Sequence, residues 1–252
     1  MNIIGIIPAR FSSSRLAGKP LVDLCGQSMI QRTYTSSQRS KLLQSLIVAT
    51  DDERIYQEVK RFQGDAEMTS QHHQSGTDRI AEVARKRGFA DEDVIVNIQG
   101  DQPLIEAITI DNLIRPLIED QALVMSTMSY RITDPQEIDN PSIVKLVSDL
   151  NGMALYFSRY AIPFVRDNEG VTLLNVPYYK HLGLYAYRKK FLDHFSSLRK
   201  SYLEQNEKLE QLRVLENGYG IKVVESEFDS LEVDTPEDVE RVKQILAEKR
   251  RR

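Results

Sequence analysis

The sequence predicts an α/β fold with a mixed, mostly parallel sheet flanked by helices. Continuous β-branched runs at 3–7, 46–49 and 94–98 are typical of strands that are buried on both faces. Amphipathic helical patterns at 53–62 and 80–88 alternate with these runs. Because parallel neighbours need a crossover connection, usually a helix, this alternation favours a parallel sheet.

Helices are marked by their spacing and by their start and stop signals. The first pattern consists of Ile55, Tyr56, Val59 and Phe62, with Gly64 as a stop signal, and the second consists of Ile80, Val83 and Ala84, ending near Gly88. The closing helix is predicted to have Thr235 as N-cap and Pro236 at its first position, with Glu237 and Asp238 in the first turn.

The middle of the chain has a different pattern. Runs at 144–147 and 154–157 flank Asn151-Gly152, a pair that tolerates positive φ and favours a hairpin turn. With a further run at 182–187, they predict antiparallel strands added to the sheet. Parallel order is expected to return with the run at 221–224.

Composition narrows the class of protein. The chain has 252 residues and a formal net charge of −4, with 41% hydrophobic and 28% charged residues, which suits one globular domain over 1–252. The mildly acidic balance argues against a nucleic-acid partner. We expect no membrane insertion and no signal peptide, because no apolar run approaches ~18 residues and no positive charge precedes the first run. A single cysteine, Cys25, excludes a disulfide framework and favours a cytoplasmic location.

A cationic loop follows the first predicted strand. Arg10, Arg15 and Lys19 lie with three serines inside 8–20, a supply of charge-assisted donors that a polyphosphate needs. The loop has neither the Walker spacing nor a dinucleotide-binding glycine pattern. A polar surface loop is the alternative interpretation. Pro20 disfavours α geometry at the residue before it, so we expect Lys19 to be extended.

Two carboxylates end apolar runs at the predicted carboxyl edge of the sheet, where open α/β sheets bind ligands. Asp101 follows the run at 94–98 and Gly100, which allows close backbone approach, and Asp234 follows 231–233. Mg²⁺ is usually held by one or two carboxylates and substrate phosphates, so this pair predicts a metal site. The alternative for Asp234 is capping of the closing helix.

A third candidate segment, 72–79, begins the second helical pattern. Ser75 and Gly76 can present short side chains and backbone amides to a ligand at a helix N-terminus. A plain N-cap is the alternative. The adjacent histidines have no partner at zinc-ligand spacing, and Cys25 lies in a turn without a catalytic partner.

Together these segments resemble the 3-deoxy-manno-octulosonate cytidylyltransferase family of sugar-nucleotide cytidylyltransferases. The matching segments are IIPARFSSSRLAGKPL, VATDDERI, HHQSGTDRIAE, VNIQGD, ALYFSRYAIPF, YKHLGLYAYRKKF, KLEQLRVLENG and EVDTPEDVERV. Each is weak alone, and their joint order over nearly the whole chain is specific. The resemblance implies a Rossmann-like, nucleotide-diphospho-sugar transferase-like fold and a cytoplasmic homodimer. It also implies transfer of CMP from CTP to an eight-carbon keto-sugar acid, with release of pyrophosphate, for lipopolysaccharide synthesis.

The resemblance also implies roles for particular residues. Arg10, Arg15 and Lys19 would hold the triphosphate, and Ala9, Ser75 and Gly76 would hold the cytosine and ribose. Asp101 and Asp234 would bind Mg²⁺, and with Lys19 they form the expected catalytic set. The sugar acid would contact Gln99, His181, Tyr187, Glu210 and Gln211. The segment 150–200 is expected to contribute to the dimer interface and the sugar site.

Two departures from the family wording leave alternatives open. Ala17 and Gln102 stand where the family usually has proline and glutamate. Because Gln102 follows the expected metal ligand, an 8-amino analogue of the sugar is an alternative substrate. An N-acylneuraminate cytidylyltransferase is the rival within the same chemistry, and a non-catalytic CTP-binding regulator is the rival from another class.

Overall fold

The computed structural model describes residues 1–12, 16–73, 75–166 and 176–251, and side chains up to residue 249. Contacts divide the chain into two units, each assembled from separate stretches of sequence. The first unit consists of Met1–Asp111, Arg188–Ser196 and Ser230–Arg252, and the second of Asn112–Tyr187 and Ser197–Asp229. The expectation of one domain over 1–252 stays a prediction.

The sheet of the first unit has the strand order β3-β2-β1-β4. Its strands are β1 (Ile3–Ala9), β2 (Ser45–Thr50), β3 (Asp65–Met68) and β4 (Val94–Asn97). All three pairings between them are parallel, which confirms the parallel arrangement predicted from the alternation of β-branched runs and helices. Ile6, Val48 and Val96 are fully buried, as expected for strands covered on both faces.

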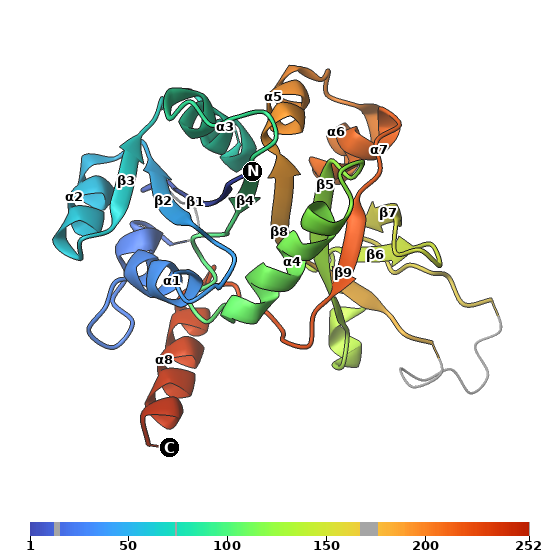
Figure 1. The fold of residues 1–252 in the computed structure, drawn as a ribbon. Helices are drawn as coiled ribbons and strands as arrows, with labels where there is room; N and C mark the ends of the chain where they lie inside the picture. Colours follow the sequence, from blue (N-terminus) through green and yellow to red (C-terminus); the bar gives the residue numbers. More distant parts are fainter. Residues whose placement is uncertain (13–15, 74, 167–175, 252) are drawn as a thin grey trace. The chain divides into compact units, whose positions relative to one another are not determined.

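Helices pack on both sides of this sheet, with α3 (Gly76–Lys86) on one side of β1 and β2 and α1 (Met29–Ser37) on the other (Figure 1). The predicted helical patterns are confirmed in α2 (Glu53–Arg61), which buries Ile55 and Val59, and in α3. The closing helix α8 (Pro236–Arg251) packs Val239 and Val242 against Leu24, Met29 and Val233. Helix α5 (Lys189–Ser197) also belongs largely to this unit.

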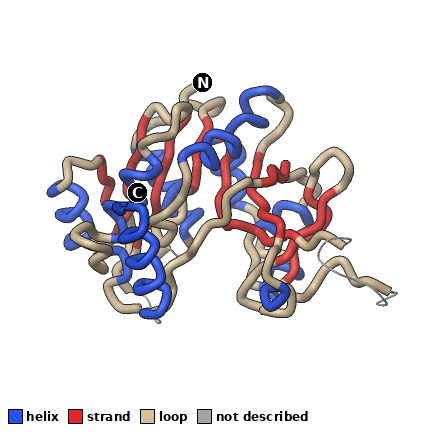
Figure 2. The backbone as a smooth tube through the Cα atoms, turned by 90° about the horizontal axis from the view of Figure 1, so that it is seen from below, coloured by secondary structure: helices blue, strands red, loops and turns tan. Residues whose placement is uncertain are grey.

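The second unit contains the antiparallel strands that the middle of the sequence predicts. β5 (Met125–Arg131) pairs antiparallel with β8 (Tyr179–Arg188) and parallel with β9 (Lys222–Glu225). β6 (Lys145–Ser148) and β7 (Ala154–Ser158) form the expected hairpin, in which Gly152 has φ 72°. Both the hairpin and the return to parallel order are therefore confirmed. Figure 2 shows the strands in red and the helices in blue.

The remaining elements connect these strands. They are α4 (Ala107–Glu119), α6 (Tyr202–Glu207), α7 (Gln211–Glu216) and the short 3-10 helices η1 (Lys19–Leu21) and η2 (Pro135–Glu137). Within the described part of the chain, every helix is too short or too polar to cross a membrane.

Candidate active site

One ammonium group lies between two carboxylates in the first unit. The Nζ atom of Lys19 lies 2.6 Å from Oδ2 of Asp101 and 2.8 Å from Oδ1 of Asp234. Asp101 follows β4, Asp234 precedes α8, and Lys19 opens η1 beyond β1. The prediction that Asp101 and Asp234 lie at the same edge of the sheet is confirmed, and Lys19 from the cationic loop meets them there.

Backbone contacts bring the two acidic segments together. The backbone N–H of Val233 donates to the carbonyl of Asp101 over 2.9 Å, which places the residues before α8 beside the end of β4. A Cβ on Gly100 would lie 3.0 Å from the carbonyl oxygen of Pro8. The close backbone approach expected at Gly100 is therefore present, and it brings the end of β4 against the end of β1.

The expectation that Lys19 is extended is wrong. Lys19 instead begins the 3-10 turn η1, after Gly18 with φ 66°. The N–H of Gly18 donates to the carbonyl of Phe11, and the N–H of Leu21 donates to the carbonyl of Gly18. These two bonds close the loop and reverse the chain, and they outweigh the local preference that proline imposes on its predecessor. The reversal directs Lys19 toward the carboxylates.

Capping of α8 uses Thr235 and Asp238. The Asp238 carboxylate accepts hydrogen bonds from the backbone N–H groups of Asp234 and Thr235 over 3.0 and 2.9 Å. In return, the backbone N–H of Asp238 donates to Oγ1 of Thr235. This reciprocal pair satisfies the helix N-terminus, as predicted for Thr235. It leaves the Asp234 carboxylate facing Lys19.

A cavity of about 420 Å³ surrounds this cluster. Six of the predicted site residues line it: Ala9, Arg10, Lys19, Gln99, Asp101 and Asp234. Glu232 and Ser12 also line it, although neither is among the predicted site residues. The sequence signal that could have pointed to Glu232 is an acidic residue between two apolar ones in the run 231–233. Arg15 lies outside the described residues.

The cavity carries strongly interacting charges. Burial opposes the charge on Lys19, but the neighbouring carboxylates of Asp101 and Asp234 outweigh it and raise the pKa of Lys19. Glu232 is open to the cavity yet surrounded by protein. Loss of solvent, followed by the charges of Asp101 and Asp234, raises its pKa to about 7. The cavity thus keeps a firmly charged cation next to closely spaced carboxylates.

Gln102 does not line this cavity. Its side chain is fully buried, and its Nε2 donates to Oε1 of Glu232 over 3.4 Å. The amide therefore contacts an acidic neighbour of the site. A glutamate at this position would place a second carboxylate beside Glu232.

The predicted cytosine and ribose residues Ser75 and Gly76 begin α3. The Ser75 side chain accepts from the N–H of Asp78 over 3.1 Å, which is the plain N-cap. Neither residue belongs to the cavity lining, but a Cβ on Gly76 would lie 3.3 Å from Cγ of Pro8, a lining residue. The start of α3 therefore packs closely behind the cavity wall. The nucleotide role of these two residues stays a prediction.

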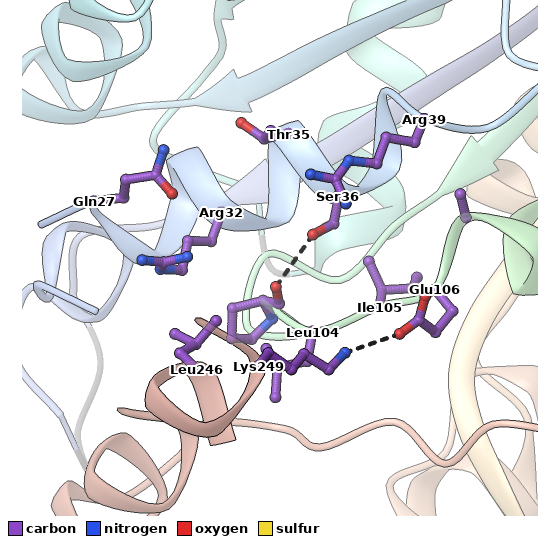
Figure 3. Close-up of a pocket in the computed structure, with 12 residues that line it drawn as sticks. Gln27, Arg32, Thr35, Ser36, Arg39, Leu104, Ile105, Glu106, Leu246 and Lys249 are labelled. Atoms are coloured by element: carbon purple, nitrogen blue, oxygen red, sulfur yellow. Dashed lines mark hydrogen bonds and ion pairs between the residues drawn. The ribbon is translucent and has the colours of Figure 1, made fainter. Parts of the chain in front are cut away.

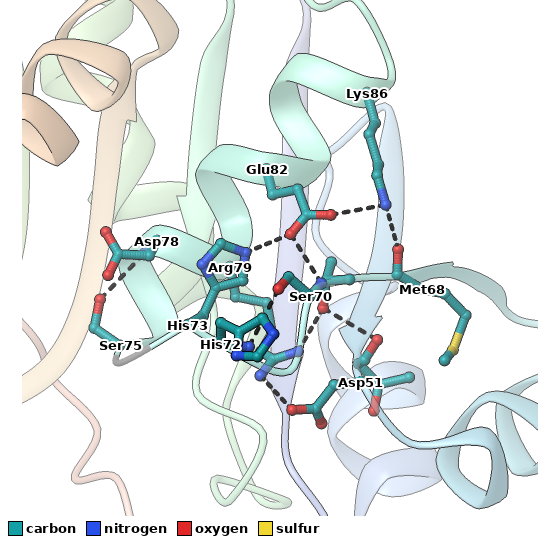
Figure 4. A network of polar contacts seen from close by, with 12 residues as sticks. Asp51, Met68, Ser70, His72, His73, Ser75, Asp78, Arg79, Glu82 and Lys86 are labelled. Atoms are coloured by element: carbon teal, nitrogen blue, oxygen red, sulfur yellow. Dashed lines mark hydrogen bonds and ion pairs between the residues drawn. The ribbon is translucent and has the colours of Figure 1, made fainter.

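A polar network holds the segment that leads into α3 (Figure 4). The Glu82 carboxylate accepts from the N–H of Ser70 over 3.0 Å, and it also contacts the ring of His73 and pairs with Lys86. Burial would raise the pKa of Glu82, but these partners outweigh it and lower the pKa to about 2. Fully buried Arg79 binds Asp51 over 2.8 Å and contacts Thr69.

Four of the predicted sugar-binding residues belong to the second unit. His181 and Tyr187 lie on β8, Glu210 precedes α7, and Gln211 begins α7. The Nε2 of Gln211 is buried and has no hydrogen-bond partner among the described residues. Burying a donor without a partner is costly, so this atom is suited to receive an acceptor from a ligand.

His181 has a defined protonation state. The Thr127 hydroxyl donates to the carbonyl of Leu184 over 2.7 Å, so it must accept from Nε2–H of His181, 2.9 Å away. Phe157 and Tyr185 pack against the ring. Burial lowers the pKa of His181 to about 3, so the ring is neutral at physiological pH.

The donor set fits a hard divalent cation. Oxygens of Asp101 and Asp234 already converge on one cationic nitrogen, and carboxylate oxygens are the ligands that Mg²⁺ prefers. Within the described ranges, no group of three or more His, Cys, Asp or Glu side chains is arranged to hold a metal without help. A metal here would therefore need oxygens from a substrate as well.

Comparison with known proteins identifies the family. Residues 4–227 match the family described as Cytidylyltransferase. The chain is 51% identical over 245 residues to a 3-deoxy-manno-octulosonate cytidylyltransferase of Syntrophus aciditrophicus, covering 97% of each chain. The chain belongs to the cytidylyltransferase family. The predicted resemblance is thus confirmed.

Solved structures agree with this cytidylyltransferase assignment. The structure of a CMP:2-keto-3-deoxy-manno-octonic acid synthetase complexed with CTP has a TM-score of 0.92 and 40% identity, covering 99% of this chain and 100% of that one. A 4-diphosphocytidyl-2C-methyl-D-erythritol synthase of Anaerococcus prevotii has a TM-score of 0.63 at 14% identity, over 98% of each chain. The second likeness is one of fold alone, and it confirms the predicted fold class.

Proposed function

We propose that this cytidylyltransferase transfers CMP from CTP to 3-deoxy-manno-octulosonate and releases pyrophosphate, a step in lipopolysaccharide synthesis. The observation that carries the proposal is the convergence of Lys19, Asp101 and Asp234 in one cavity. Relatives that cover nearly the whole chain carry this activity in their names. A chain of the same fold and 40% identity has been solved with CTP.

The nucleotide half of the site follows from charge. Arg10 and Lys19 line the cavity and can neutralise the triphosphate, and Arg15 is assigned the same role from the family resemblance. Ala9, Ser75 and Gly76 are proposed to hold the cytosine and ribose. Asp101 and Asp234 are proposed to hold Mg²⁺, which would supply positive charge to offset the negative charge that gathers during transfer.

The sugar half of the proposal involves Gln99, His181, Tyr187, Glu210 and Gln211. Neutral His181 cannot pair with the acid as an ion, and its Nε2–H already binds Thr127, so its role is to shape the site. The unpartnered Nε2 of Gln211 can donate to a sugar oxygen.

The reaction is an in-line displacement at phosphorus. The anomeric oxygen of the sugar forms a bond to the α-phosphorus, the bond from that phosphorus to pyrophosphate breaks, and the hydroxyl proton passes to solvent. The chain contributes orientation of the two substrates and neutralisation of the leaving pyrophosphate by Lys19 and Arg10.

We further propose a cytoplasmic homodimer. Leu155, Tyr160 and Phe164 are 60%, 80% and 81% exposed within ten residues of the second unit. Exposed aromatic and apolar side chains at this density are typical of interface cores. Cys25, the single cysteine, forms no disulfide, which suits a reducing compartment.

The proposal is tested by measuring pyrophosphate release with CTP, Mg²⁺ and a panel of keto-sugar acids. We expect turnover with 3-deoxy-manno-octulosonate and a lower kcat/KM with N-acetylneuraminate. A higher kcat/KM with the 8-amino sugar would move the assignment to that analogue. Absence of release with every sugar, despite CTP binding, would favour a non-catalytic CTP-binding protein.

A further inference from the structure

The first unit contains a second cavity, of about 220 Å³, that shares no lining residue with the candidate active site. It is bounded by α1, by residues 103–107 and by the C-terminal part of α8 (Figure 3). The proposed reaction assigns it no role.

Positive charge gathers around this cavity. Arg32, Arg39 and Lys249 line it together with one carboxylate, Glu106. The surplus of two positive charges is notable in a chain whose formal net charge is −4. The three cationic side chains come from α1, the turn after it and α8, so tertiary packing brings them together.

Arg32 is held in a fixed orientation. Its Nε donates to the carbonyl of Leu24 over 2.5 Å, and its Nη2 donates to the carbonyl of Cys25 over 3.2 Å. Both acceptors are neutral carbonyl oxygens. A side chain that is already ordered loses little rotamer entropy when a ligand binds.

The other two cations remain available to an anion. Lys249 pairs with Glu106 over 3.1 Å, but the two side chains are 60% and 44% exposed, and exposed ion pairs contribute little. Among the described residues, the Arg39 guanidinium has no hydrogen-bond or ion-pair partner.

Apolar side chains lie beside these charges. Pro103, Leu104, Ile105 and Leu246 line the cavity next to Glu106 and Lys249, while Thr35 and Ser36 of α1 add hydroxyl groups next to Arg32 and Arg39 (Figure 3). Cationic groups next to apolar surface suit a ligand with an anionic head and a compact apolar body. The cavity is smaller than the ~300 Å³ at which drug-sized pockets begin, so the body is limited to a small ring or short chain.

We propose that this cavity binds a small phosphate monoester. At pH 7 a phosphate monoester carries a charge of about −1.5 to −2, which matches the surplus of the lining. Arginine presents paired N–H donors that match phosphate oxygens better than lysine alone does. Inorganic phosphate has the same anionic head but no apolar body. Comparing its affinity with that of the monoester therefore measures what the apolar side chains contribute to binding.

The test is calorimetric titration of the full chain with phenyl phosphate, in the presence of saturating CTP and no sugar acceptor. CTP then occupies the nucleotide site, and the remaining binding reports on the second cavity. We expect at least ten-fold weaker binding in the double variant Arg39→Gln/Lys249→Gln. The matched control is Arg241→Gln/Lys243→Gln, which also removes one arginine and one lysine charge, on a part of α8 outside this cavity. This control should bind phenyl phosphate like the wild type.

A second variant separates the head from the body. Leu246→Ala should weaken binding of phenyl phosphate several-fold and leave that of inorganic phosphate unchanged. Methyl NMR of the wild type should show shifts at Ile105 and Leu246 on adding phenyl phosphate, which requires no variant to fold. Equal affinity of the wild type and the double variant, displacement by CTP, or no binding at millimolar concentration would each overturn the proposal.

Discussion

At the residue scale, Asp234 has two informative neighbours: Lys19, which binds its side chain, and Asp238, whose carboxylate accepts from its backbone N–H at the start of α8. Asp234→Asn should therefore leave the melting temperature within about 2 °C of wild type. It should lower Mg²⁺-dependent turnover by about 100-fold or more, because a metal ligand contributes several kcal/mol to the barrier. Thermal melting and pyrophosphate release measure the two effects.

The control for this variant is Asp238→Ala on the same turn. Losing the cap should cost about 1 kcal/mol of stability while turnover per folded enzyme stays near wild type. If Asp234→Asn kept wild-type turnover, the metal role would be wrong.

Lys19 stands between two carboxylates, so its removal has two consequences. Lys19→Ala should weaken CTP binding about ten- to 100-fold, because a partly buried charge-assisted contact to phosphate is lost. The same variant should bind Mg²⁺ more tightly than wild type in the absence of CTP, because both carboxylates lose their competing cation. Calorimetry with each ligand measures both, and unchanged CTP affinity would contradict the phosphate role.

At the scale of elements, Glu82 ties α3 to the segment before it through Ser70, His73 and Lys86. Its pKa of about 2 lies below the ordinary value of 4.5, so it contributes stability that is fully present above about pH 4.5. That contribution is lost as the pH falls toward 2.

Glu82→Gln should therefore lower the stability by about 1 to 2 kcal/mol at pH 7, the range of a hydrogen bond to a charged group. The difference from wild type should shrink as the pH falls from 5 to 3. Thermal melting across this range tests it, with Glu119→Gln on exposed α4 surface as the control. A difference that does not change with pH would show that the carboxylate charge is not what stabilises the segment.

At the scale of the whole molecule, the exposed residues of segment 150–164 predict association. Light scattering at micromolar concentration should give a dimer, and Tyr160→Ser/Phe164→Ser should shift it to a monomer by removing apolar contact area. Tyr202→Ser is the matched control, since Tyr202 is 74% exposed on α6 outside this segment. A wild-type monomer would end the proposal.

The sequence by itself determined the α/β class, the main strands and the cap of α8. These features depend on contacts between near neighbours: continuous β-branched runs for β1, β2 and β4, helical spacing for α2 and α3, and the Thr235-to-Asp238 box. The order of the candidate motifs also identified the family and half of the residues that line the active-site cavity.

Only the tertiary structure decided how those residues act on one another. Lys19 is 82 positions from Asp101 and 215 from Asp234, so no local pattern could show that one ammonium binds both carboxylates. The turn at Lys19, the proximity of Glu232 and the burial of Gln102 were likewise missed. Each depends on which distant segments come into contact. Tertiary packing of the whole unit decides those contacts, because local backbone preferences act only between near neighbours.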